Sequence, residues 1–356
     1  MKIVTVIGAR PQFIKASVVS RAIGRQPGMQ EVVIHTGQHF DDNMSQVFFE
    51  QLDIPSPAHH LGVSNAPHGA MTGRMLEGVE KVLMLENPDW VLVYGDTNST
   101  LAGALAARKM DIPVAHVEAG LRSFNLRMPE EINRILTDRI SSLLCCPTEA
   151  AIQNLRNEGF DHFPSQVALT GDVMKDVALY YQGFARPPMV SLPQTFFLAT
   201  LHRAENTDDP DRLRSVFAAF QEMATWREIV LPLHPRTAQY IQRYEIMVPP
   251  GVHIIEPVGF LEMIYLIRQS ELILTDSGGL QKEAFFHHRP CVTLRDETEW
   301  TELVDHGFNV VAGTGTEEIL EAAHKQWKGT YNFDIPLYGH GDAAVSIVDL
   351  INHTGG

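Results

Sequence analysis

Short, nearly unbroken hydrophobic runs alternate with longer amphipathic stretches through the first 150 residues. The hydrophobic runs are residues 2–7, 32–35, 90–94, 113–117 and 143–146, and we expect each to be a strand. The stretches at residues 13–23, 102–109 and 129–142 have helical composition. Strands that are apolar throughout are typical of a parallel sheet covered by helices on both faces.

The same alternation starts again in the second half of the chain. The expected strands there are residues 195–200, 228–233, 252–255, 272–275 and 290–294, after a proline-rich stretch at 183–193 that reads as a connecting loop. The pattern therefore predicts an α/β protein with two Rossmann-like domains facing across a cleft. We place the first domain at residues 1–170 and the second at 171–339, with the boundary near 165–190.

The net charge of the chain limits the classes of molecule that it is expected to bind. The chain has 356 residues, a suitable length for two domains, and a net charge of −15. This acidity argues against nucleic acid or an anionic membrane as a partner. An anionic substrate would need a local basic pocket.

Cysteine usage and hydropathy predict a soluble, cytoplasmic protein, and the spacing of potential ligands argues against a metal site. Cys145, Cys146 and Cys291 do not form a disulfide framework, and no CxxC or HExxH spacing indicates a metal site. The first residues lead directly into a predicted strand rather than a signal peptide. No apolar run reaches transmembrane length.

Polar residues collect directly after the predicted strands, where parallel sheets bind their ligands. In the first half these are Gly8, Arg10, Lys15, Gly95, Asp96, Thr97, His116, Glu118, Gly120, Arg122, Glu130, Glu131 and Arg134. In the second half they are His202, Arg203, His234 and residues 276–283. Two or three cations beside a glycine turn suit a diphosphate.

The stretch 272–285 is a strand, a turn and a helix that together suit a nucleoside diphosphate. Gly278 and Gly279 allow close approach of the backbone to a ligand, and Ser277 can cap the helix. The first amides of that helix favour an anion. Glu283, one turn later, can accept hydrogen bonds from a vicinal diol such as ribose. The alternative is an ordinary strand-to-helix turn.

Three acids, Asp96, Glu118 and Glu130, are more than phosphate binding needs. Carboxylates that face one cleft can take different pKa values and serve as base and acid. Each acid also has a simpler explanation. Asp96 could cap the next helix, and Glu130 could serve only the dipole of its helix while Arg134 pairs with it on the surface.

Two further features limit the chemistry. His116 lies between valines, so we expect a packed or backbone-bonded histidine rather than a ligand. The first loop, Gly8-Ala9-Arg10-Pro11, is not GxGxxG, which argues against a nicotinamide dehydrogenase.

Six short blocks stand in a fixed order along the chain. They are Gly8-Ala9-Arg10-Pro11 with Ile14-Lys15, Gly95-Asp96-Thr97, the HVEAGLR run 116–122, Pro129-Glu130-Glu131 with Asn133-Arg134, His202-Arg203, and Thr275-Asp276-Ser277-Gly278-Gly279. Together they resemble the non-hydrolysing UDP-N-acetylglucosamine 2-epimerase family. One block alone is weak evidence, but six with matching spacing are specific. The resemblance runs almost end to end.

The resemblance implies a glycosyltransferase-B-type fold whose C-terminal helix, about 340–356, returns to the first domain. It implies removal of the C2 proton of a UDP-2-acetamido sugar and elimination of UDP to a 2-acetamidoglucal. A proton then returns to the other face of C2, and UDP is added again. It implies no metal or other cofactor. It also implies a homodimer.

The resemblance also assigns residues to roles. Asp96, Glu118, Glu130 and His202 are the expected catalytic residues, with no individual face of C2 assigned. The expected substrate-binding residues are Arg10, Lys15, Arg134, His234, Val258, Met263, Ser277, Gly278, Gly279, Glu283 and Trp300. In this set Glu283 would hold the ribose, and the loop from Val258 to Met263 would read uracil.

Several positions depart from the UDP-N-acetylglucosamine pattern. Gln12 and Lys282 stand where the family has glutamates, and Trp300 stands where it has an arginine. Phe40 replaces an arginine of members that substrate activates, which puts such activation in doubt. The departures resemble the branch acting on UDP-2,3-diacetamido-2,3-dideoxyglucuronic acid, a source of O-antigen mannuronic sugar.

Three other functions stay open from the sequence. A glycosyltransferase of the same fold would use the diphosphate groove but has little use for three acids. A hydrolysing epimerase would carry a fused kinase or a variant site. A nucleotide-sugar sensor would be expected to lose the acids, and none is lost.

Overall fold

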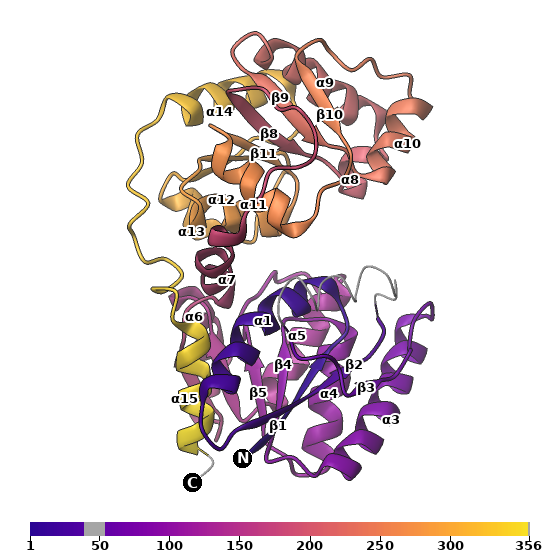
Figure 1. Ribbon diagram of the computed structural model, residues 1–356, viewed down its shortest axis with the longest axis vertical. Helices are drawn as coiled ribbons and strands as arrows, with labels where there is room; N and C mark the ends of the chain where they lie inside the picture. The colour runs from indigo at the N-terminus through magenta and orange to yellow at the C-terminus, as the bar shows by residue number, and fades with distance from the viewer. Residues whose placement is uncertain (39–53, 355–356) are drawn as a thin grey trace. The chain divides into compact units, whose positions relative to one another are not determined.

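The chain forms two compact units in the computed structural model, which describes residues 1–38 and 54–354 (Figure 1). The first unit comprises Met1–Val177 and Pro336–Gly356, and the second comprises Ala178–Ile335. Phe40, singled out in the sequence, lies outside the described residues. Each unit has its own parallel sheet.

The sheet of the first unit has seven strands in the order β3-β2-β1-β4-β5-β6-β7. Every pairing in it is parallel. Its strands are β1 (Lys2–Ile7), β2 (Gln30–His35), β3 (His59–His60), β4 (Trp90–Tyr94), β5 (Val114–Val117), β6 (Leu143–Cys146) and β7 (Gln166–Leu169). Because β4 and β5 are neighbours, the turns that follow them lie at one edge of the sheet.

Helices cover both faces of this sheet. They are α1 (Arg10–Arg25), α3 (His68–Glu86), α4 (Asn98–Lys109), α5 (Pro129–Ile140), α6 (Glu149–Asn157), most of α7 (Val173–Tyr181) and α15 (Ala343–Thr354). Apolar side chains of α3 and α4 form a core with valines of β1 and β4. The helices α1 and α15 pack together beside the opposite face (Figure 1).

The C-terminal helix α15 is tied to the first unit by a buried carboxylate. Asp176 on α7 accepts hydrogen bonds from the amides of Ala343 and Ala344, at 3.2 and 2.9 Å. Burial raises the pKa of Asp176 to about 6, with Asp342 and Asp172 adding to the rise against the effect of the two amides. The ionised carboxylate is therefore less favourable here than in the unfolded chain.

Replacing Asp176 with asparagine should remove one source of pH dependence. A pKa raised from 3.8 to about 6 means that the folded chain binds more protons between these values. The contribution of Asp176 to stability is then largest below pH 3.8 and is lost as the pH rises through 6. We expect the unfolding free energy of the wild type, minus that of Asp176→Asn, to fall across this window in urea titrations. A difference that is flat or rises with pH would contradict the account.

The second unit contains a six-stranded parallel sheet in the order β10-β9-β8-β11-β12-β13. The strands are β8 (Phe196–Thr200), β9 (Glu228–Pro232), β10 (Val252–Ile255), β11 (Ile273–Thr275), β12 (Cys291–Thr293) and β13 (Asn309–Val311). The helices are α8 (Ala204–Thr207), α9 (Pro210–Met223), α10 (Pro235–Arg243), α11 (Phe260–Gln269), α12 (Gly278–Phe286), α13 (Thr301–Asp305) and α14 (Thr316–Lys328).

Alternate side chains of β8 enter separate cores, as expected for a strand buried on both faces. Phe197 and Ala199 pack with residues of α9 and α14, whereas Phe196 and Leu198 pack with residues of α11 and α12. Helices therefore cover both faces of this sheet too. The turn between β11 and α12 lies next to the end of β8, its neighbour in the sheet.

The expected α/β class with two parallel-sheet domains is confirmed. Strands 90–94, 143–146 and 252–255 have the predicted bounds. The sequence prediction missed β3, β7 and β13, which are short strands at the edges of their sheets. These three strands are short and partly exposed, so they lack the continuous apolar run by which the other strands, including the edge strand β10, are found.

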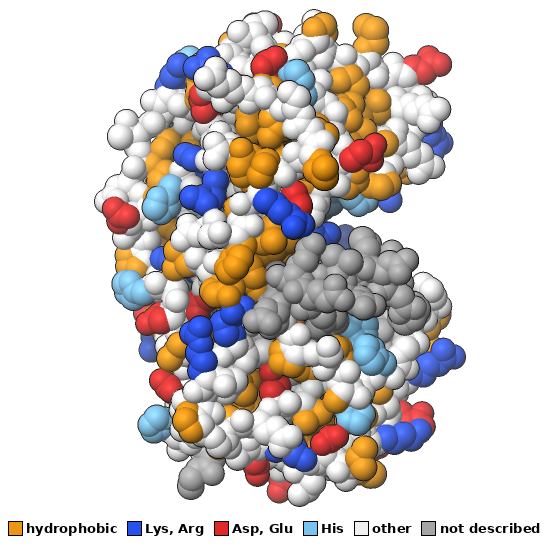
Figure 2. Space-filling view, viewed as in Figure 1, with side chains coloured by type: hydrophobic (Ala, Val, Ile, Leu, Met, Phe, Trp, Pro, Cys, Tyr) orange, Lys and Arg blue, Asp and Glu red, His pale blue; other side chains and the backbone are white. Residues whose placement is uncertain are grey.

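No helix among residues 1–38 and 54–354 has the length and apolar character needed to cross a membrane. On the face drawn in Figure 2, acidic and basic side chains are interspersed.

Candidate active site

The turn after β4 holds Asp96 at the carboxyl edge of the first sheet. Gly95 takes the left-handed conformation, with φ of +63°, and its amide donates to Val117 O at 3.0 Å. The residue that caps α4 is Thr97, whose side chain accepts from Thr100 N. The alternative in which Asp96 serves as the helix cap is therefore wrong.

Two side chains of α5 hold Asp96 in place. Arg134 forms an ion pair with its carboxylate, and Asn133 Nδ2 donates to Asp96 O at 2.9 Å. Burial lowers the pKa of the Arg134 guanidinium, but Asp96, Glu131 and Glu118 outweigh burial and leave it raised. Arg134 is thus a partner of Asp96 and not the surface partner of Glu130 that the helical spacing allowed.

Glu118 lies at the neighbouring turn, after β5. It has a left-handed backbone with φ of +72°, which is uncommon for a residue other than glycine and persists only when surrounding contacts fix it. Its amide donates to Cys145 O at 3.1 Å, and its carboxylate pairs with Lys15 of α1. A Cβ atom on Gly95 would lie 3.4 Å from Glu118 Oε2, so the two turns are in close contact.

The two glutamates that open α5 lie in different surroundings. Glu130, which the sequence proposes as catalytic, is exposed. Glu131 is 1% exposed and accepts hydrogen bonds from the amides of Ser123 and Phe124, at 3.0 and 2.8 Å. Sequence reasoning gave Glu131 no role. The available signals were its place in the block 129–134 and its position three residues before Arg134.

The second unit has a strand, a turn and a helix over 272–285, as the sequence predicts. Ser277 occupies the N-cap position of α12, but its side chain makes no capping hydrogen bond. Asp276 is fully buried and accepts hydrogen bonds from the amides of His202 and Arg203, both at 2.9 Å. Asp276 thereby joins the end of β8 to the turn after β11.

His202 and His234 lie side by side at this end of the second sheet, with ring centroids 5.6 Å apart. Burial lowers the pKa of His202, and His234 and Arg203 lower it further, against the opposite effect of Asp276. These surroundings favour the neutral imidazole of His202 over the cation. His234 Nδ1 accepts from Arg236 N at 3.2 Å and so caps α10.

Lys282 and Trp300 both differ from the family pattern, and their side chains are in contact with each other. Lys282 Nζ lies 4.0 Å from the centroid of the Trp300 ring, and both side chains are buried. Trp300 Nε1 donates to Gly278 O at 2.9 Å. Trp300 therefore supports the turn that Gly278 and Gly279 form. Direct contact of Trp300 with a substrate stays a prediction.

The other expected binding residues lie in the same two regions. Glu283 is half-buried on α12, one turn after Gly279. Val258 and Met263 pack at the edge of the core beside α11. Arg10, at the start of α1, is exposed near Lys15 in the chain. A Cβ atom on Gly278 would lie 2.2 Å from Glu299 Oε1, so a larger residue here would require the Glu299 side chain to move.

Within each unit the geometry suits one part of a reaction. The first unit brings together the carboxylates of Asp96 and Glu118, which are paired with the cations Arg134 and Lys15. Such carboxylates can remove a proton from a carbon atom or return one to it. The second offers helix amides and half-buried Glu283, which suit an anion joined to a diol. No cluster of three potential metal ligands occurs among the described residues.

Comparison with known proteins gives consistent results. The sequence model of the UDP-N-acetylglucosamine 2-epimerase family matches residues 21–352. The chain is 56% identical over 353 residues to the UDP-2,3-diacetamido-2,3-dideoxy-D-glucuronate 2-epimerase of Pseudomonas aeruginosa, covering 99% of each chain. It is 41% identical over 367 residues to the UDP-N-acetylglucosamine 2-epimerase of Methanocaldococcus jannaschii, again covering 99% of each.

The crystal structure of the Methanocaldococcus jannaschii enzyme in complex with UDP-GlcNAc and UDP has a similar fold. The TM-score is 0.87 at 40% identity, over 99% of this chain and 100% of that one. The glycosyltransferase-B-type fold expected from the sequence is therefore confirmed.

Proposed function

The chain belongs to the UDP-N-acetylglucosamine 2-epimerase family, and on that premise we propose that its substrate is UDP-2,3-diacetamido-2,3-dideoxyglucuronic acid. Its reaction is C2 epimerisation of a UDP-sugar, so it is an isomerase. The observation that carries the choice of sugar is the 56% identity over the full chain to an enzyme named for that substrate. UDP-N-acetylglucosamine is the second candidate, supported by 41% identity to an enzyme named for it.

The contact between Lys282 and Trp300 supports the same choice. The family pattern has a glutamate and an arginine at these positions, and this chain has instead a cation over an aromatic ring. The change alters charge and shape beneath the turn at Gly278 without removing its glycines. Such a change is expected where the sugar next to the diphosphate carries different substituents.

We propose an elimination and re-addition mechanism for the reaction. One carboxylate removes the C2 proton while the C1–O bond to UDP breaks, which forms the C1–C2 double bond of a glucal. An acid on the other side returns a proton to C2, and the UDP oxygen adds again to C1. Asp96 and Glu118 are at adjacent turns, each oriented by an ion pair, and serve best as the two groups. Glu130 stays a third candidate.

UDP is assigned to the turn and helix of the second unit. The amides at the start of α12 would bind the diphosphate. The side chains of Arg10, Lys15 and His202 would stabilise the charge of the UDP that leaves C1. Val258 and Met263 belong to the stretch proposed to read uracil.

Replacing Glu283 with alanine should weaken UDP binding. If Glu283 accepts both ribose hydroxyls, their loss costs about 1–3 kcal/mol, the usual penalty for polar partners left unpaired. Calorimetry with UDP checks this. Glu297→Ala is a suitable control, because Glu297 is an exposed glutamate of the same unit. An unchanged affinity in the Glu283 variant would remove the ribose assignment.

The choice of sugar can be tested by comparing kcat/KM for the two UDP-sugars, with products separated by anion-exchange chromatography. We expect the diacetamido uronate to be preferred by at least about tenfold, since a site built for its polar groups rejects a sugar that lacks them. Equal values, or a preference for UDP-N-acetylglucosamine, would mean that the contact of Lys282 with Trp300 does not determine specificity.

A homodimer in the cytoplasm is also part of the proposal, as the family resemblance and the sequence imply. Large apolar side chains stand exposed before and along α5: Phe124, Leu126, Ile132 and Leu136. They are a candidate contact surface between two copies. Sedimentation of a Leu126→Asp variant would test this, since a charge there should favour the monomer. An unchanged sedimentation coefficient would rule this surface out.

A further inference from the structure

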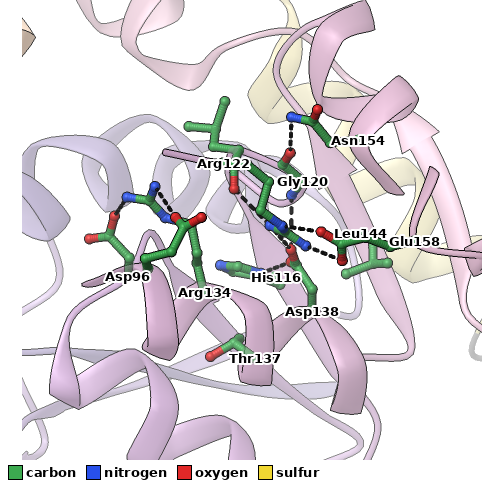
Figure 3. Close-up of polar contacts among 12 residues, drawn as sticks. Asp96, His116, Gly120, Arg122, Arg134, Thr137, Asp138, Leu144, Asn154 and Glu158 are labelled. Atoms are coloured by element: carbon green, nitrogen blue, oxygen red, sulfur yellow. Dashed lines mark hydrogen bonds and ion pairs between the residues drawn. The ribbon is translucent and has the colours of Figure 1, made fainter. Parts of the chain in front are cut away.

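His116 on β5 is fully buried and lies between two hydrogen-bond acceptors, of which Figure 3 shows Asp138. Its Nδ1 atom is 2.7 Å from Asp138 Oδ1 on α5. Its Nε2 atom is 2.7 Å from the backbone oxygen of Gly95. Both ring nitrogens are therefore engaged.

These contacts determine the protonation state of the ring. A backbone oxygen can only accept, so Nε2 carries a hydrogen. Asp138 also accepts from Arg122 Nη1 at 2.7 Å. Burial raises the pKa of the Asp138 carboxyl, but its contacts with His116 and Arg122 outweigh burial and hold it below its usual value. Since Asp138 is ionised, Nδ1 also carries a hydrogen, and His116 is an imidazolium.

The buried charges are balanced within one network. Arg122 lies between Asp138 and Glu158, and its Nε and Nη2 atoms donate to the two Glu158 oxygens at 2.6 and 2.9 Å (Figure 3). Two cations, His116 and Arg122, thus face two carboxylates. Glu158 lies on the opposite side of Arg122 from His116 (Figure 3), and its side chain is 26% exposed, so it is the outer end of the network.

The network holds both turns that carry the candidate catalytic acids. On one side His116 donates to Gly95, the residue before Asp96. On the other, Asp138 Oδ2 accepts from the amide of Gly120, two residues after Glu118, at 3.2 Å. Gly95, Glu118 and Gly120 all have positive φ, so both turns use conformations that need external support.

We propose that His116, doubly protonated and paired with Asp138, is a positioning residue for the epimerisation. It fixes the Gly95 backbone oxygen and thereby the direction of the Asp96 carboxylate relative to Glu118. This inference rests on the catalytic roles proposed for Asp96 and Glu118. The charge matters because only the imidazolium donates to both acceptors at once; a neutral ring would leave one of two buried oxygens without its hydrogen.

Replacing His116 with glutamine tests the proposal. The amide nitrogen of glutamine cannot reach both acceptors as the ring does, so the turn of Gly95 loses its support. We expect kcat to fall by about 10²-fold, the usual effect of misplacing a catalytic group by about 1 Å. KM and the Kd for UDP should stay within about threefold, because UDP is assigned to the second unit.

Two readouts separate positioning from a general loss of folded protein. UDP titration should give the same number of sites per chain as in the wild type, whereas partial unfolding would reduce that number. Glu158→Gln is the matched control, because it alters the same network at its outer end and leaves His116, Asp138 and Gly95 in contact. Its kcat should stay within about threefold of the wild type.

Nitrogen-15 NMR of the histidine rings tests the charge directly in the wild-type protein. Both nitrogens of His116, assigned by the missing signals of His116→Gln or of His116→Asn, should have shifts of protonated nitrogens at pH 7 to 8. A neutral ring would overturn the proposal, and so would a charged ring with unchanged kcat in the variant. If the wild type epimerises neither UDP-sugar, the proposed function fails, whatever the NMR spectrum shows.

Discussion

Asp96→Asn is expected to lower kcat by about 10²- to 10⁴-fold, the range typical of losing a positioned general acid or base. Asparagine has nearly the same shape as aspartate, so Asn133 can still donate to the backbone oxygen of residue 96, and Arg134 keeps its contact with Glu131 at 2.9 Å. The loss should therefore be one of proton transfer and not of folding. UDP affinity should change less than about twofold, because the diphosphate is assigned to α12.

Turnover and UDP calorimetry on the same preparation check this result. Asp111→Asn is a suitable control, since Asp111 is a fully exposed aspartate of the same unit. Near-normal turnover of Asp96→Asn would exclude Asp96 from the chemistry. A loss of UDP affinity of more than tenfold would show that the carboxylate has a structural role.

Asp138→Ala is expected to lower the free energy of unfolding by about 3–5 kcal/mol, the usual effect of breaking a buried ion pair from one side. Asp138 is fully buried between His116 and Arg122 and also accepts from the amide of Gly120. Its removal leaves two buried cations with one carboxylate, Glu158. Urea denaturation gives the change, provided that the m value stays constant.

Acid pH provides a second check on Asp138. Its folded pKa is held below the ordinary value of 3.8, so its contribution is present above that value and is lost as the pH falls through the folded pKa. The difference between wild type and Asp138→Ala should thus be full at pH 7 and shrink in strong acid. Glu77→Gln, at an exposed pair with Lys81, should leave stability unchanged. A loss below about 1 kcal/mol for Asp138→Ala would mean that the network contributes little to folding.

The sequence predicts the central strands well but misses three of the four edge strands of the two described sheets, for a physical reason. β4 and β6 are buried on both faces, so each is an uninterrupted apolar run. β7, with its pattern of partial exposure, is read as loop because half of its side chains meet solvent. The parallel order follows from the alternation of strands and helices.

The sequence predicts those residues of the candidate site that directly follow a strand. Asp96 and Glu118 follow adjacent strands, so the rule that ligands lie beyond the carboxyl ends anticipates their proximity. The same rule collects Glu131 without indicating its role, and it does not find Asp138. They lie on α5, where a charged residue usually faces solvent, and only the fold shows that both are buried.

The sequence also does not predict contacts between residues that are far apart in the chain. Lys282 and Trp300 appear in the chain as two separate departures from a family pattern, and the structure shows one contact beneath Gly278. His116 was expected to be packed or bonded to the backbone, and it is bonded to Gly95 O. Its second partner, Asp138, is 22 residues away in the chain, a separation that has no local signature.

Proton NMR in heavy water, with UDP-2,3-diacetamido-2,3-dideoxyglucuronic acid as substrate and UDP-N-acetylglucosamine in parallel, tests the central claim most directly. The account predicts inversion at C2 of the diacetamido uronate, with deuterium from solvent at that carbon in the product. Inversion with the original hydrogen retained would contradict the two-acid mechanism. Failure of both sugars to react would contradict the epimerase function itself.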